Sequence, residues 1–199
     1  MTGQARWQTV ATRNGTSIPL IGLRQAPDCD CIQSVSALVP PPSVSLPCVL
    51  ADPAATDALG QALAQIVRPG LLVTLEGPLG SGKTHLVRSL LRALGHAGRV
   101  KSPTYTVMEP YLLSWGAVTH FDFYRFADGQ EADDAGLREE FNAHTLCLVE
   151  WPSRATRWLP PADLALTWQP VAAGRLVECR CGPAIPLAAL RQALQELGL

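Results

Sequence analysis

A glycine-rich stretch that ends in a lysine and a threonine stands near the middle of the chain. It reads Gly77-Pro78-Leu79-Gly80-Ser81-Gly82-Lys83-Thr84 and matches the pattern G-x-x-x-x-G-K-T. Because glycine has no Cβ, successive backbone N–H groups can turn toward an anion at close range. The lysine supplies a positive charge to phosphate oxygens, and the threonine hydroxyl can bind Mg²⁺. These residue types in this order predict a site for a nucleotide polyphosphate and its metal ion.

The segments on either side of the loop fit a phosphate loop. Leu71-Leu72-Val73-Thr74-Leu75 is a short apolar run typical of a buried strand. A helical pattern follows the loop and ends at Gly95, with the apolar positions Leu86, Val87, Leu90, Leu91 and Leu94. The free N–H groups and the positive dipole end of that helix would face the same anion.

Two acidic residues stand at the ends of other predicted strands. Glu150 follows Thr145-Leu146-Cys147-Leu148-Val149, and Asp122 follows the weaker run Val118-Thr119-His120-Phe121. A carboxylate in this place can hold Mg²⁺ directly or through water. A solvated strand end gives the same pattern, but the presence of both acids beside a phosphate loop favours the metal site.

Thr104 is a candidate switch residue. The preceding Ser102-Pro103 disfavours a helix, so the hydroxyl could be free to meet a γ-phosphate, although an ordinary turn explains the pattern equally well. His85 and His120 are interpreted first as structural residues, one in the first helical turn and one in a strand.

The remaining pattern predicts one α/β domain from residue 49 to 199. A helix is expected to begin at Asp52-Pro53, a polar helical stretch lies around 130–141, and further strands lie near 164–168 and 175–179. Leu187, Leu190, Leu194 and Leu197 mark a closing helix. Interleaved strands and helices predict a three-layer fold of the P-loop NTPase type, with a mostly parallel sheet, some antiparallel strands and helices on both faces.

Residues 1–48 differ in composition from the rest. They contain Pro40-Pro41-Pro42 and no sustained helical or alternating pattern, so we interpret them as a flexible or ill-packed extension. A second interpretation is that they are not translated, since a start near Val49 would leave the domain whole.

Composition excludes several classes of function. The 199 residues have a formal net charge of −1, which predicts no broad basic surface, no DNA partner and only local or indirect contact with other nucleic acids. No run reaches the ~18 apolar residues of a membrane helix. The chain shows no secretory signal, so we expect a reducing, cytoplasmic location without disulfides. The six cysteines include two Cys-x-Cys pairs, which leave a zinc site as a minor alternative.

Four motifs in order resemble the bacterial TsaE (YjeE) ATPases over about residues 50 to 180. They are the phosphate loop, Ser102-Pro103-Thr104-Tyr105-Thr106, His120-Phe121-Asp122-Phe123-Tyr124-Arg125 and Val149-Glu150-Trp151-Pro152. The resemblance implies a weak ATPase that works with TsaB and TsaD to form threonylcarbamoyladenosine beside the tRNA anticodon. Because the net charge is near zero, we expect these partners to supply most of the tRNA contact. It also implies that ATP and Mg²⁺ are the ligands.

The resemblance assigns roles to particular residues. Lys83 and Thr84 bind ATP and Mg²⁺, Glu150 is a metal ligand, and Asp122 and Thr104 act in hydrolysis and switching. Three further residues are assigned to the nucleotide site, His85, Ser153 and Arg175. Apart from the resemblance, Trp151 and Trp115 are expected to be exposed and are therefore candidates for partner contact.

Two departures from the family keep alternatives open. Pro78 stands where aspartate is usual, which removes one N–H and stiffens the loop, and His85 replaces a common second threonine. A catalytically weak nucleotide-binding adaptor is therefore one alternative.

A small-molecule kinase is a second alternative, because Arg154 and Arg157 could close over phosphates as a lid. A GTPase is disfavoured, since neither Asn14 nor Asn142 precedes a lysine.

Overall fold

The computed structural model describes residues 9–11, 17–19, 45–127, 129–172 and 174–199. The chain divides into two compact units, residues 1–41 and 42–199. In the first unit, β1 (Thr9–Ala11) pairs antiparallel with β2 (Ser17–Pro19). The sequence pattern of residues 1–48 predicts neither strand, because three residues are too few for alternation to be recognised.

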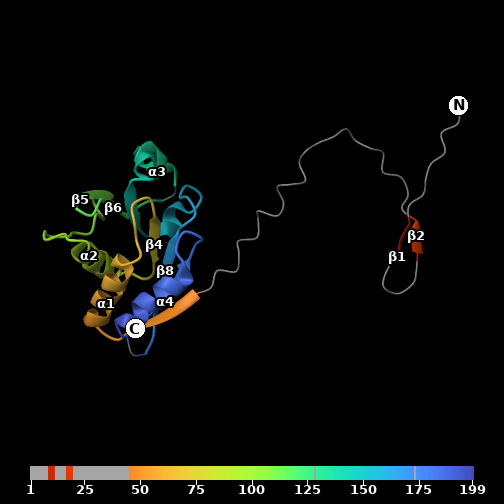
Figure 1. The fold of residues 1–199 in the computed structure, drawn as a ribbon. Coiled ribbons are helices and arrows are strands. Elements are labelled where there is room, and N and C mark those ends of the chain that lie inside the picture. Colours follow the sequence, from red (N-terminus) through yellow and green to blue (C-terminus); the bar gives the residue numbers. More distant parts are fainter. Residues whose placement is uncertain (1–8, 12–16, 20–44, 128, 173) are drawn as a thin grey trace. The chain divides into compact units, whose positions relative to one another are not determined.

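Seven strands of the second unit form one sheet in the order β3-β9-β8-β4-β7-β6-β5 (Figure 1). The strands are β3 (Ser45–Leu50), β4 (Leu72–Glu76), β5 (Met108–Leu112), β6 (Ala117–Asp122), β7 (Thr145–Glu150), β8 (Leu164–Pro170) and β9 (Arg175–Cys181). β8, β4, β7 and β6 pair in parallel, and β3 runs in their direction because β9 is antiparallel to both β3 and β8. β5 is antiparallel to β6. The predicted mostly parallel sheet is confirmed.

Helical elements cover both faces of the sheet. On β7, Leu146 and Leu148 belong to one hydrophobic core, and Cys147 and Val149 belong to a second core on the opposite face. The first core is shared with α1 (Pro53–Ala64), α2 (Lys83–Ala93) and α4 (Leu187–Glu196). The second is shared with α3 (Gln130–Asp134) and two 3₁₀ helices, η2 (Leu137–Glu140) and η3 (Pro152–Ala155). The predicted three-layer fold is thereby confirmed, and Figure 1 shows α4 beside α1.

The start of α1 follows the predicted local chemistry. The Asp52 side chain accepts a hydrogen bond of 2.8 Å from the backbone N–H of Ala55, and Pro53 occupies the first turn. Buried Leu59 and Leu63 pack this helix into the first core.

The polar helix predicted over 130–141 is wrong as a single element. The structure divides it into α3 and η2. Gly136 lies between them with a φ of 67°, a left-handed conformation that ends the right-handed helix. Leu137 and Phe141 still pack into the second core. Their spacing therefore predicted correctly that both side chains face the core, but not that the helix is interrupted.

The two edge strands of the sheet were not predicted. β3 begins at Ser45, so the predicted boundary at residue 49 falls within a strand that pairs with β9. β5 lies at the opposite edge, where the sequence analysis placed no strand. Each contains a proline, Pro47 or Pro110, which an edge strand tolerates but which weakens the sequence signal.

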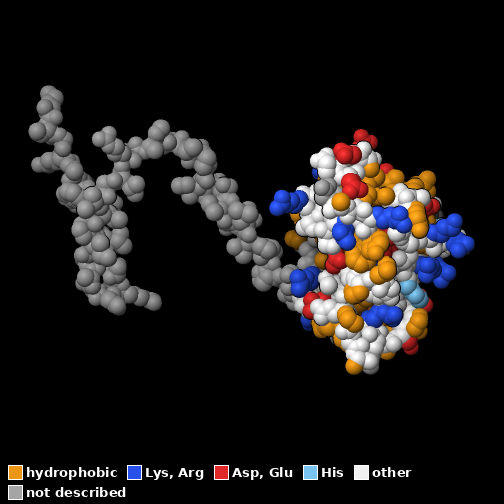
Figure 2. All heavy atoms as spheres, turned by 180° about the vertical axis from the view of Figure 1, so that it is seen from behind, with side chains coloured by type: hydrophobic (Ala, Val, Ile, Leu, Met, Phe, Trp, Pro, Cys, Tyr) orange, Lys and Arg blue, Asp and Glu red, His pale blue; other side chains and the backbone are white. Residues whose placement is uncertain are grey.

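None of the helices in the described ranges is long and apolar enough to cross a membrane. On the face shown in Figure 2, lysine and arginine side chains lie in separate groups among hydrophobic and uncharged ones. This face carries no single continuous basic surface.

Candidate nucleotide-binding site

The loop between β4 and α2 has the backbone that its glycines predict. Gly80 and Gly82 have φ values of 74° and 107°, and a Cβ at either position would meet nothing within 4 Å. These two glycines are therefore needed for their left-handed backbone and not for lack of space. Gly82 also caps α2 without a side-chain hydrogen bond, so the first N–H groups of that helix remain available to an anion.

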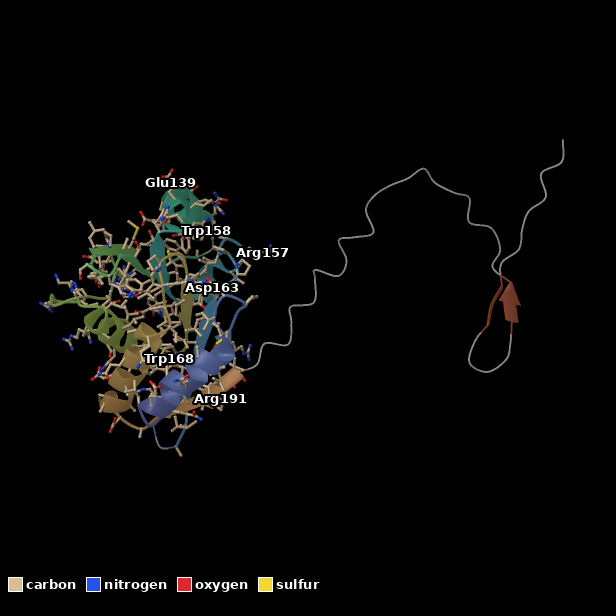
Figure 3. The ribbon with its side chains drawn as sticks, in the orientation of Figure 1. Glu139, Arg157, Trp158, Asp163, Trp168 and Arg191 are labelled. Atoms are coloured by element: carbon tan, nitrogen blue, oxygen red, sulfur yellow. The ribbon has the colours of Figure 1, made fainter. Side chains whose placement is uncertain are left out.

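Gly77 has a different role from the other two glycines. A Cβ at this position would lie 2.6 Å from Cβ of Trp168 on β8, the residue labelled in Figure 3. Gly77 thus lets the beginning of the loop pass close to the neighbouring strand.

Lys83 is buried, with 4% of its surface exposed. Its Nζ donates hydrogen bonds to the carbonyl oxygens of Gly77 at 2.8 Å and Pro78 at 3.0 Å. The Nζ also lies 4.1 Å from the centre of the Trp151 ring. Burial lowers the pKa of Lys83, and the charges of Glu150, Glu76 and Asp122 oppose this effect.

Glu150 joins the helix after the loop to the sheet. Its Oε1 accepts a hydrogen bond of 2.7 Å from the Thr84 hydroxyl and lies 3.0 Å from Nε2 of His120. In the strand register Glu150 stands opposite Asp122, so parallel pairing of β6 and β7 brings the two acids together. Both are buried, with 3% and 4% of their surfaces exposed.

Asp122 holds the loop that contains Thr104. Its Oδ2 accepts hydrogen bonds from Ser102 Oγ at 2.9 Å and Thr104 Oγ1 at 2.6 Å. Its Oδ1 accepts one from the backbone N–H of Tyr124 at 3.0 Å. The carboxylate thereby ties the Ser-Pro-Thr segment to the end of β6.

These groups line one cavity of about 250 Å³. Its lining residues are Leu79, Gly80, Ser81, Gly82, Lys83, Thr84, His85, Ser102, Thr104, Asp122, Tyr124, Glu150 and Trp151. The structure therefore brings the predicted loop, the two predicted acids and Thr104 to one site at the carboxyl ends of β4, β6 and β7.

Comparison with known proteins identifies the family. A family model described as "Threonylcarbamoyl adenosine biosynthesis protein TsaE" matches residues 50–176, which is more than half of the chain. The chain belongs to the TsaE family. The curated protein "tRNA threonylcarbamoyladenosine biosynthesis protein TsaE" from Haemophilus influenzae is 46% identical over 94 residues, which are 47% of this chain and 60% of that protein. The protein of the same name from Bacillus subtilis is 36% identical over 115 residues, covering 58% of this chain and 72% of that protein.

A solved structure supports the same fold for this TsaE family member. The crystal structure of Bacillus subtilis YdiB matches it with a TM-score of 0.61 and 26% sequence identity, covering 78% of this chain and 95% of that one. The chain spans less than two thirds of the length of the Haemophilus influenzae TsaE protein.

The lining of the cavity fits a hard divalent cation and an anion in this TsaE family member. The Thr84 hydroxyl and the Glu150 carboxylate offer oxygen atoms, the donors that Mg²⁺ prefers. Ser81 Oγ is buried and has no hydrogen-bond partner among the described residues, which leaves it available to a ligand in the loop.

Two of the three further residues assigned to the nucleotide site have other contacts. His85 lines the cavity, but its Nε2 lies 2.9 Å from Oδ1 of Asp57 on α1. The Ser153 N–H donates a hydrogen bond of 3.0 Å to Glu76, and Ser153 lines a different cavity of about 530 Å³. Arg175 is the first residue of β9 and stands opposite Pro170, the last residue of β8. It is not among the residues that line the cavity. Their roles toward a nucleotide stay predictions.

Sequence reasoning missed several residues of the site. Glu76 ends β4 and accepts hydrogen bonds from the N–H groups of Gly77 and Ser153 at its two carboxylate oxygens. The strand-end argument used for Asp122 and Glu150 would have found it. Ser102 and Tyr124 line the cavity within motifs that had been recognised. Trp151, a candidate for partner contact, is half-buried with its ring against Lys83, and Trp115 is half-buried as well.

The cysteines give no support to a zinc site. Cys48, Cys147, Cys179 and Cys181 are free thiols, and burial raises the pKa of each, that of Cys147 to about 12. Within the ranges that the structure describes, no three histidine, cysteine or acidic residues are grouped to hold a metal ion. Cys29 and Cys31 lie outside those ranges.

Proposed function

We propose that this protein binds and hydrolyses ATP with Mg²⁺ and serves as an accessory factor in forming threonylcarbamoyladenosine beside the tRNA anticodon, together with TsaB and TsaD. One observation carries the proposal: the phosphate loop, Asp122 and Glu150 meet at one cavity in a member of the TsaE family. The printed names of its relatives, which refer to tRNA threonylcarbamoyladenosine biosynthesis, support the pathway.

Different residues of the site would bind the phosphates and the metal ion. Lys83 would exchange the carbonyl oxygens of Gly77 and Pro78 for phosphate oxygens, which are stronger partners for an ammonium group. Thr84 and Glu150 would hold the Mg²⁺ ion. When bound, Mg²⁺ neutralises charge on the β- and γ-phosphates.

Asp122 and Thr104 would govern hydrolysis. In hydrolysis the bond between the γ-phosphorus and the β–γ bridging oxygen breaks, and a bond from water to phosphorus forms. The Asp122 carboxylate is the group we assign to orient that water, and Thr104 is the hydroxyl that leaves Asp122 to meet the γ-phosphate.

We propose a cytoplasmic setting in which TsaB and TsaD supply most of the tRNA contact. The formal net charge of −1 supports indirect contact, because direct RNA binding relies on dense positive charge. A small-molecule kinase is the alternative, with Arg154 and Arg157 as a lid. Neither arginine lines the cavity of the phosphate loop, and Arg157 lines a separate recess with Trp158, both labelled in Figure 3.

The reconstituted modification reaction tests the proposal. TsaB, TsaD, tRNA and threonylcarbamoyl-adenylate are combined with the wild-type chain or with Lys83→Ala or Glu150→Gln. We expect repeated cycles of modification and ATP consumption with the wild type, and arrest after about one cycle with either variant. Full cycling by Lys83→Ala would contradict an ATPase role, and full cycling by Glu150→Gln would favour the adaptor. Phosphate transfer to a metabolite would favour the kinase.

A further inference from the structure

His120 is a fully buried polar residue beside the candidate metal site. It lies on β6, two residues before Asp122, with 0% of its surface exposed. Residues two apart on a strand face the same way, so His120 and Asp122 share the face that meets Glu150 across the β6–β7 pairing. From its place in the sequence, this histidine is interpreted first as structural.

The hydrogen bond to Glu150 determines which ring nitrogen carries the proton. An ionised carboxylate can only accept, so Nε2 of His120 donates to Oε1 of Glu150 over 3.0 Å. A neutral ring then has a bare lone pair at Nδ1. Among the described residues Nδ1 has no hydrogen-bond partner and is buried. This tautomer is the one that leaves no buried N–H unsatisfied.

Packing alone gives no reason for an imidazole in this place. Burying a polar atom without a partner destabilises a fold, whereas an apolar side chain of similar size would fill the position without that penalty. Among the described residues, the one hydrogen bond of the His120 ring is to Glu150. The contact therefore points to the carboxylate as the reason for the histidine.

Glu150 receives two donors on one oxygen. Thr84 donates to Oε1 from α2, and His120 donates to the same atom from β6. No hydrogen bond within the described part of the chain reaches Oε2. A cation bound by the Thr84 hydroxyl would disturb the first donor, whereas the second comes from β6, a strand paired on both sides with β5 and β7.

We propose that His120 is a positioning residue for Glu150, whose carboxylate it holds in the orientation that receives Mg²⁺ together with Thr84. This inference rests on the proposed function, because it assigns His120 to the metal site of that function. Partners of metal ligands in other proteins typically contribute about 10- to 100-fold to metal affinity.

Calorimetric titration of the full chain with ATP, in excess Mg²⁺ and separately in a chelator, tests the proposal. For His120→Leu we expect the gain in ATP affinity from Mg²⁺ to fall about tenfold or more, with affinity in the chelator unchanged. His120→Gln keeps an N–H donor and should restore most of the gain. The matched control is His96→Leu, which removes a ring that packs against Tyr111 and should leave both affinities unchanged.

The outcomes separate this inference from the proposed function. Failure of the wild-type chain to bind ATP would overturn the proposed function and this inference with it. If the wild type binds and His120→Leu keeps its full Mg²⁺ dependence, only the inference is overturned. Equal loss of affinity with and without Mg²⁺ would show a merely structural role and overturn it as well. Nitrogen NMR of the histidine rings is an independent check: a His120 ring without a proton on Nε2 would contradict the hydrogen bond on which the inference depends.

Discussion

Lys83 illustrates how a functional charge affects the stability of the fold. Its ammonium group is buried among backbone carbonyls and the Trp151 ring, and burial lowers its pKa below the ordinary value of 10.5. The unfolded chain therefore binds this proton more tightly than the folded chain does. Protonated Lys83 destabilises the fold below its folded pKa, and the penalty disappears as pH rises through the folded pKa to 10.5.

The first prediction concerns this pH dependence. We expect the free energy of unfolding of the wild type to rise relative to that of Lys83→Met as pH increases from neutral toward 10.5, because the folded state gives up its proton first. Urea denaturation at closely spaced pH values measures the difference. A difference that falls over this interval would contradict the burial argument.

The second prediction concerns Thr104. Thr104→Val keeps the size of the side chain but removes the hydrogen bonds to Asp122 and Ser102. We expect ATP hydrolysis in the reconstituted system to fall about a hundredfold, since the hydroxyl proposed to meet the γ-phosphate is lost. ATP affinity should change little. Thr106→Val in the same loop is the control, and equal loss in both variants would argue against a specific role.

At the scale of residues, a functional side chain could be predicted where neighbouring residues in the sequence identify it. Lys83 and Thr84 lie in one contiguous motif, and Asp122 and Glu150 each follow a recognisable strand. The contact between His120 and Glu150 could not be read from the chain, because it depends on the register of β6 against β7. A shift of one residue would turn His120 to the other face of the sheet.

At the scale of elements, the beginning of the phosphate loop combines a backbone requirement with a packing requirement. Gly77 has a φ of 151° and passes within reach of Trp168, whereas Gly80 has a φ of 74° in open space. A side chain at Gly77 would suffer both backbone strain and crowding by Trp168, whereas a side chain at Gly80 would suffer backbone strain alone.

The third prediction uses this contrast. Gly77→Ala should lower the free energy of unfolding by about 3 kcal/mol, because the new methyl group would overlap Trp168 at 2.6 Å. Gly80→Ala should lower it by about 1 kcal/mol, the strain of a left-handed backbone alone. Urea denaturation of both variants gives the comparison. Equal losses would show that Trp168 moves away freely.

The central elements were predicted and the edges were not, for a physical reason. β4 and β7 are covered on both faces and are therefore nearly continuous apolar runs. β3 and β5 are largely exposed and each contains a proline, so neither has the continuous apolar run of a buried strand. Each is recognised as a strand only by its pairing, β3 with β9 and β5 with β6. The break at Gly136 depends on a left-handed backbone that helical spacing does not reveal.

At the scale of the whole molecule, the sheet defines the start of the folded domain. Cys48 and Leu50 on β3 are buried in the first core, with 2% and 0% of their surfaces exposed. A chain that began near Val49 would lose four of the six residues of this strand, Ser45 to Cys48. Truncated chains with and without β3 can therefore test where the folded domain begins.

The fourth prediction compares two truncations. Removing residues 1–44 should leave the midpoint of thermal unfolding of the sheet domain unchanged, because β3 is retained. Removing residues 1–50 should lower it by several degrees and promote aggregation, because the edge of β9 is exposed and core side chains are lost. Equal midpoints for the two proteins would show that β3 adds nothing to the stability of the domain.

The cavity at the carboxyl ends of β4, β6 and β7 is the centre of this account, and ATP binding tests it most directly. Calorimetric titration of the full chain with ATP and Mg²⁺ should show one site for the wild type. Lys83→Ala should bind at least about tenfold more weakly, because a charge-assisted contact to phosphate contributes about 1.5–3 kcal/mol. Unchanged affinity in Lys83→Ala, or no binding by the wild type, would contradict the assignment of this cavity as the nucleotide site.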